Sequence, residues 1–131
     1  MIKIRLSILF MLLLLLINPI VAEANTKEIY LRDDLILELL YPLISKEIHK
    51  EFHERKQFDC QQVISIKKSS EGSYYFNVDI QLVTFEGPHN PPNYLVNMSF
   101  SNSTSNGKWT VTSFKKRLLH DDEKLPCRHP V

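Results

Sequence analysis

Hydrophobic and polar residues follow three successive patterns along the chain: an apolar run at the start, a helical pattern, and alternating segments in the second half. After a short lead-in at residues 25–32, apolar residues recur from Asp33 onward at the spacings of three and four that are typical of an amphipathic helix. The apolar positions of this helix are Ile36, Leu37, Leu40, Ile44, Ile48 and Phe52. Pro42 lies within the pattern and lacks a backbone donor, so we expect a kink near residues 38–41 or two abutting helices.

Beyond residue 58 the period changes to two, which is typical of β-strands. We expect strands at residues 63–66, 74–82, 94–100 and 109–114. In the second of these, apolar residues fall on one face and polar residues on the other, as in an antiparallel sheet with one solvated side. The apolar positions are Tyr74, Phe76, Val78, Ile80 and Leu82. The irregular step from Val111 to Phe114 indicates a bulge or the end of the last strand.

A helix followed by four sequential strands predicts an α+β fold. We expect a long, Pro-kinked N-terminal helix to pack on a four-stranded antiparallel meander in a cystatin-like arrangement. A four-stranded half-barrel is the main alternative. The core of this single domain would span about residues 33–117, and residues 118–131 would form a C-terminal tail.

The first 24 residues have the pattern of a secretory signal peptide. Two basic residues precede an unbroken run of apolar or small residues at positions 6–17, and small residues surround a cleavage site after Ala24. The alternative is an uncleaved membrane anchor, but at about 1.5 Å per residue this run is much shorter than a hydrocarbon core of about 30 Å. We therefore expect a mature domain of residues 25–131 that is secreted or held at the cell envelope.

Composition and charge narrow the classes of function. A hydrophobic fraction of 44% with only 3 glycines excludes a disordered or collagen-like chain and leaves little material for a phosphate-binding glycine loop. The 16 Lys and Arg residues nearly balance the 15 Asp and Glu residues. Removal of residues 1–24, called the leader below, makes the numbers of basic and acidic residues equal. We therefore expect no nucleic-acid partner, and membrane contact only through the leader if it is not cleaved.

Two stretches resemble a known family. They are Leu-Leu-Tyr-Pro-Leu-Ile at residues 39–44 and Val-Thr-Phe-Glu-Gly-Pro-His-Asn-Pro-Pro at residues 83–92. The chain is similar over residues 33–116 to a family of small exported proteins of unknown function from Gram-positive, spore-forming bacteria, whose central motif is Thr-Phe-Glu-Gly-X-His-Asn-Pro-Pro. The resemblance implies export and a bacterial origin, but it implies no activity.

The proline-rich segment at residues 86–93 is the best candidate site, because prolines restrict a loop that carries polar side chains. Glu86, His89 and Asn90 are its candidate binding residues. A carboxylate three positions from a histidine can orient it as a general base or join it in binding a metal. Alternatively, Glu86 and Asn90 only cap turns, and the prolines only fix a hairpin connection.

Histidines and cysteines elsewhere offer weaker candidates. His49 and His53 have i, i+4 spacing, which on one helix face suits a metal, but no further ligand spacing accompanies them, and we expect neither a metal nor a cofactor. Cys60 and Cys127 are the only cysteines, and in an exported domain we expect them to form a disulfide. Two free thiols are the alternative.

No pattern in the chain matches a nucleophile elbow or a pair of catalytic carboxylates. We therefore expect a non-catalytic binding or envelope-associated protein, not an enzyme, with an unknown protein or small molecule as its ligand. The alternative is a small metal-dependent or hydrolytic enzyme that uses Glu86 and His89. A structural envelope protein without a discrete site is a third hypothesis.

Overall fold

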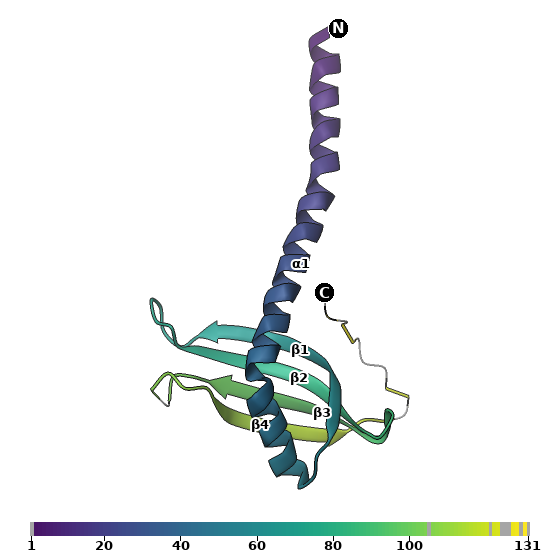
Figure 1. The fold of residues 1–131 in the computed structure, drawn as a ribbon. Helices are drawn as coiled ribbons and strands as arrows, with labels where there is room; N and C mark the ends of the chain where they lie inside the picture. Colours follow the sequence, from purple (N-terminus) through teal and green to yellow (C-terminus); the bar gives the residue numbers. More distant parts are fainter. Residues whose placement is uncertain (1, 105, 121, 124–126, 129, 131) are drawn as a thin grey trace.

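The computed structural model describes residues 2–104, 106–120, 122–123, 127–128 and 130, with side chains described from residue 25 onward. One helix is followed by four strands, so the fold is α+β as predicted. The elements are α1 (Ile2–Phe52), β1 (Gln57–Lys68), β2 (Phe76–Glu86), β3 (Asn90–Ser101) and β4 (Thr110–Leu118). The strands form an antiparallel meander in the order β1-β2-β3-β4. The C-terminal part of α1 lies across one face of this sheet, and its earlier turns extend past the sheet edge (Figure 1).

Helix α1 is longer and more regular than the sequence pattern suggests. It begins at Ile2 and runs unbroken to Phe52, so the predicted start near Asp33 and the predicted pair of abutting helices are wrong. No glycine or proline interrupts residues 20–41, which explains why the lead-in is helical. Around Pro42, the buried side chains of Leu40 and Ile44 hold both sides of the helix to one sheet. A kink at residues 38–41 stays a prediction.

The core lies between the apolar stripe of α1 and one face of the sheet, as predicted. The helix contributes Leu37, Leu40, Ile44 and Ile48, and the sheet contributes Val78, Ile80, Leu82, Val96, Met98 and Phe100. Most of these side chains are essentially inaccessible, as with Ile44 and Phe100, each 0% exposed. At roughly 1.5–3 kcal/mol for each large apolar side chain removed from water, this contact stabilises the fold more than helix propensity does.

The predicted start of the second strand is wrong. Tyr74 precedes β2 and is 88% exposed, and Phe76 is only half-buried. Asn102 explains why β2 begins only at Phe76. Its side-chain Oδ1 accepts a hydrogen bond from the Phe76 amide at 2.6 Å, and its Nδ2 donates to the Tyr74 carbonyl at 3.0 Å. A side chain thus replaces the partner strand, and the ladder does not extend to Tyr74.

Strand β1 is twelve residues long, whereas the sequence predicted only residues 63–66. Its pairing with β2 shifts register between Asp59 and Gln62 and again between Val63 and Ser65. Bulges of this kind break the alternation of buried and exposed positions. The full length of β1 therefore could not be predicted from a period of two in the sequence. The predicted irregularity in the last strand is confirmed, since Phe100 pairs with Val111 while Ser99 pairs with Ser113.

The face of the sheet turned away from α1 is polar in its central part. The hydroxyls of Ser65 and Ser99 each donate to the Asp79 carboxylate at 2.6 Å. These two hydrogen bonds outweigh the effect of partial burial and lower the pKa of Asp79. Toward the β2–β3 turn this face is not polar, because Val83 and Leu95 pair across the strands and are both buried.

A disulfide joins Cys60 in β1 to Cys127 in the tail, with a Cα–Cα distance of 4.8 Å across a sequence separation of 67. The predicted bridge is therefore present. Beside it, the Arg128 guanidinium donates to the Asp34 carboxylate and lies over the Tyr30 ring at 4.7 Å, so the tail also contacts α1. Within the part of the chain that the structure describes, no helix is both long enough and apolar enough to cross a membrane.

Candidate functional site

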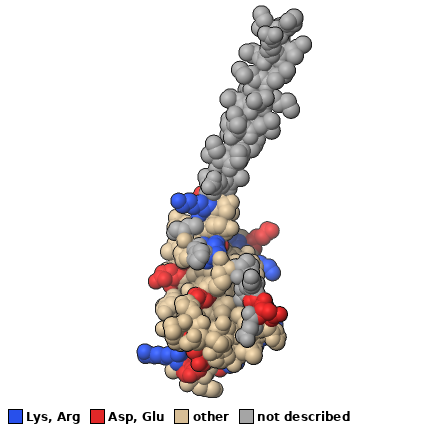
Figure 2. Space-filling model, turned by 90° about the vertical axis from the view of Figure 1, so that its right-hand side faces the viewer, with Lys and Arg blue, Asp and Glu red and all other residues tan. Residues whose placement is uncertain are grey.

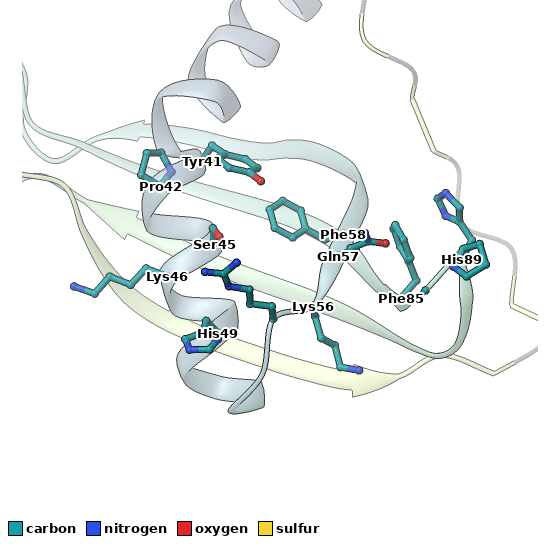
Figure 3. A pocket seen from close by; sticks show the side chains of 13 residues that line it. Tyr41, Pro42, Ser45, Lys46, His49, Lys56, Gln57, Phe58, Phe85 and His89 are labelled. Atoms are coloured by element: carbon teal, nitrogen blue, oxygen red, sulfur yellow. The ribbon is translucent and has the colours of Figure 1, made fainter.

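An open groove of about 1100 Å³ lies between α1, the start of β1 and the β2–β3 turn (Figure 3). Thirteen residues line it: Tyr41, Pro42, Ser45, Lys46, His49, Arg55, Lys56, Gln57, Phe58, Phe85, Gly87, Pro88 and His89. The helix supplies one wall, and the opposite end is closed by Phe85 and His89. The groove therefore joins the predicted loop to parts of the chain that are distant in sequence.

The loop itself is shorter than predicted. Strand β2 ends at Glu86 and β3 begins at Asn90, so only residues 87–89 connect them. Residues 90–93 belong to β3, although two of them are prolines. Both prolines lie in the register shift between the pairs Thr84–Tyr94 and Glu86–Asn90, where neither has a partner in β2, and the pairing of β3 with β4 ends at Tyr94. Proline is tolerated there because a bulge does not need its missing amide donor.

Glu86 points to a lysine rather than to His89. The Lys56 ammonium lies 2.6 Å from the Glu86 carboxylate and 3.1 Å from that of Glu54. The Lys56 side chain is only 4% exposed, and its ammonium lies over the Phe52 ring at 5.5 Å. Burial alone lowers the pKa of Lys56, but the hydrogen bonds and charges of Glu86 and Glu54 outweigh it and raise the pKa. This pair fixes the connection between α1 and β1 to the end of β2.

His89 occupies the tip of the turn and forms two side-chain contacts. Its ring stacks on Phe85 with centroids 4.0 Å apart, and its Nδ1 lies 3.2 Å from Oδ2 of Asp59. The backbone of His89 has a φ of 63°, a conformation in which histidine is enriched among non-glycine residues. The side chain is 66% exposed, so a ligand in the groove can reach it.

The three candidate residues do not converge on one point. Glu86 is engaged by Lys56, His89 by Asp59, and Asn90 is exposed and lies outside the groove lining. A general-base arrangement in which Glu86 orients His89 is therefore not formed in this geometry.

The histidine pair of the helix is also separated by the fold. His49 is exposed on α1 and lines the groove, but His53 lies beyond the last helical residue with a φ of 58°. The two side chains therefore do not share the helix face that their spacing suggested. Among the described residues, no group of three or more His, Cys, Asp and Glu side chains is placed to hold a metal ion.

Charge in the groove is one-sided. None of the thirteen lining residues is acidic, whereas Lys46, His49, Arg55 and Lys56 are basic, although the charge of Lys56 is compensated by Glu54 and Glu86. Arg55 is exposed and has no hydrogen bond or ion pair to another residue that the structure describes. By contrast, Figure 2 shows acidic and basic side chains mixed over the described part of the face that it presents.

An aromatic pair lies beside these cations. The rings of Tyr41 on α1 and Phe58 on β1 have centroids 5.6 Å apart, and Tyr41 is 46% exposed. Beyond this pair a second cavity of about 670 Å³ continues toward Cys60 and Arg128. Arg55, Tyr41 and Phe58 were not predicted as site residues, because only the packing of α1 beside β1 brings them together.

Residues 32–117 match a family described as a protein of unknown function (DUF3888). The chain belongs to this family. The matched region contains every residue of the groove but ends before Cys127, so the disulfide depends on a cysteine outside it. No curated protein and no solved structure matches the chain.

Proposed function

We propose that this DUF3888 domain is exported and acts by non-catalytic binding, with the groove between α1 and β1 as its binding site. The ligand class that fits is an anion that carries a flat apolar group. The observation that carries this proposal is the groove lining, in which Arg55, without an ion pair to any described residue, lines the same groove as the aromatic side chains of Tyr41 and Phe58, and no lining residue is acidic.

Each part of the lining has a distinct chemical role in this proposal. The Arg55 guanidinium offers a fork of donors that suits a carboxylate, sulfonate or phosphate. Tyr41 and Phe58 offer ring surface for the apolar part of the ligand. His89, stacked on Phe85 and exposed at the far end, offers a further polar contact. We therefore assign the predicted loop to one end of the site, with Glu86 as a scaffold residue beside it.

The export part of the proposal is supported by the signal-peptide pattern of residues 1–24 and by the disulfide, since structural disulfides persist in oxidising compartments. The helix-on-meander arrangement, which we propose is cystatin-like, supplies a rigid frame for the groove. The enzymatic alternative has less support, because it requires Glu86 beside His89, whereas Glu86 lies against Lys56 and His89 against Asp59.

Two fluorescent probes test the ligand class. Anilinonaphthalene sulfonate carries an aromatic surface and an anionic group, and N-phenylnaphthylamine carries the same rings without the charge. We expect the purified protein to bind the sulfonate more tightly, and Arg55→Ala to weaken that binding about tenfold by removing a charge-assisted hydrogen bond. Arg55→Lys should retain part of the affinity.

The matched control is Lys108→Ala, which removes an exposed cation between β3 and β4 that is not part of the groove lining. It should leave binding of the sulfonate unchanged. Equal affinity for the charged and uncharged probes, or equal loss in the Arg55→Ala and Lys108→Ala variants, would contradict an anion site in the groove.

A further inference from the structure

The side of α1 opposite the sheet carries a line of exposed leucines. Leu31, Leu35 and Leu39 are 58%, 59% and 70% exposed. Because each residue turns an α-helix by about 100°, residues four apart lie on the same side, while Leu35 and the buried Leu37 point in nearly opposite directions. We call these three leucines the outer stripe.

Opposite charges stand at the two ends of the outer stripe. Glu28 precedes the stripe and Lys46 follows it. The two residues are 18 positions apart, which is five helical turns of about 3.6 residues, so both lie on the same side of the helix as the stripe. Lys46 points away from the sheet and from the centre of the groove (Figure 3). It has no hydrogen bond or ion pair to the other described residues. Glu28 is paired with Arg32 at 3.2 Å, but that pair is exposed and therefore weak.

Leu35 and Leu39, together with the two flanking charges, are complementary to themselves when the helix is reversed. Residue 37 is the midpoint both of Leu35 and Leu39 and of Glu28 and Lys46. A two-fold axis beside this level places Leu35 of one chain against Leu39 of a second, and Glu28 against Lys46 at both ends. Contacts of this reciprocal kind define an isologous dimer interface.

We propose that two copies of the protein associate through the outer stripe with their α1 helices antiparallel. The sheet lies on the other side of α1 and does not obstruct a second helix (Figure 1). The tail contacts α1 at Tyr30 and Asp34, and the exposure of the three leucines shows that it leaves them uncovered.

The charge pattern is the reason that we choose a second copy as the occupant. An apolar stripe alone would fit many surfaces, but an acid at one end and a base at the other fits its own reverse. The contact is small, since it involves one side of one helix, and stable complexes bury at least about 1,200 Å² in total. We therefore expect a reversible dimer that dissociates on dilution below micromolar concentrations.

Sedimentation equilibrium tests the dimer on protein expressed from the complete chain and purified as its bacterial host processes it. We expect the wild-type mass to rise with concentration toward that of a dimer. The double substitution Leu35→Gln and Leu39→Gln changes only exposed side chains, so it should fold with an unchanged circular dichroism spectrum and stay monomeric.

Charge reversal tests the antiparallel geometry. Glu28→Lys alone, and Lys46→Glu alone, should each weaken association about tenfold, while the two substitutions in one chain should restore it. Lys108→Glu, an exposed charge reversal away from α1, is the control and should have no effect.

The proposal would be overturned by a wild-type protein that is monomeric at the highest concentrations, by a dimer that survives the glutamine substitutions, or by a doubly reversed chain that fails to regain association. Binding of the stripe to phosphatidylglycerol vesicles without self-association would also overturn it. None of these outcomes depends on Arg55 or on the groove probes, so the two proposals fail separately.

Discussion

Lys56 and Glu86 form an ion pair of 2.6 Å that joins the segment after α1 to the end of β2. Lys56 is almost wholly buried, while Glu86 is half-exposed at the groove's edge. Glu86, which the sequence predicted to bind a ligand, thus holds two elements of the scaffold together. The same turn presents His89 to solvent, so scaffold and binding roles are divided between two neighbours in one motif.

This division predicts different stabilities for substitutions in the turn. Glu86→Gln leaves the buried Lys56 ammonium with Glu54 as its only carboxylate partner among the described residues, and should lower the free energy of unfolding by about 1–2 kcal/mol. His89→Asn keeps a residue that tolerates positive φ and should cost less than about 1 kcal/mol. Urea denaturation measures both. Glu71→Gln, in an exposed turn, is the control, and an equal effect in Glu71→Gln and Glu86→Gln would contradict the scaffold role.

The disulfide should contribute strongly to stability. Closing a loop with a sequence separation of 67 restricts the unfolded chain, and the chain-entropy relation gives about 4 kcal/mol. We expect the paired substitution Cys60→Ser and Cys127→Ser to lower the free energy of unfolding by roughly this amount in urea denaturation. Thiol labelling of the unreduced, denatured wild type should detect no reactive cysteine. Two labelled thiols per chain would show that the bridge does not form.

Asp79 predicts a particular pH dependence. Hydrogen bonds from Ser65 and Ser99 lower its pKa in the folded state below the unfolded value of about 3.9. Its ionised form therefore stabilises the fold above about pH 4, and this contribution is lost as the pH falls through the lower folded pKa. The stability difference between wild type and Asp79→Asn should be larger at about pH 7 than at about pH 3. A difference that does not change with pH would exclude this role, and the exposed Asp122→Asn serves as the control.

Cleavage of the leader is a prediction about the start of the mature chain. Secreted protein should begin at Asn25, so its intact mass should correspond to residues 25–131 with the disulfide formed. Mass spectrometry of the culture medium measures this. Full-length protein found only in the membrane fraction would mean that the leader is retained as an anchor.

The sequence was sufficient to predict the elements whose burial pattern is regular. The stripe of α1 and the alternation of β2 and β3 follow directly from the requirement that apolar side chains face one core. Strand β1 was underestimated because its two register shifts disrupt that alternation. The tolerance of β3 for prolines could not be predicted either, because it depends on the register shift against β2 and on where pairing with β4 stops.

The candidate site was predictable only at one end. The motif at residues 86–90 identified His89, which lines the groove. Lys56, the partner of Glu86, precedes β1, and Asp59, the partner of His89, lies within β1, so the motif itself gives no indication of either contact. Arg55 and Tyr41 could not be predicted as site residues either, because their place in the groove depends on contacts between distant parts of the chain. A basic residue after a helix and an aromatic residue on it are ordinary until the fold places them around one groove.

The most direct test of the groove as the binding site is to map the contact residue by residue. Amide chemical shifts of the nitrogen-15-labelled protein should be recorded while anilinonaphthalene sulfonate is added. The binding account predicts that the largest shifts occur at Tyr41, Arg55, Phe58 and His89, and that they are strongly reduced in Arg55→Ala. Shifts concentrated on the outer stripe or on the polar face of the sheet, with the groove unchanged, would contradict it.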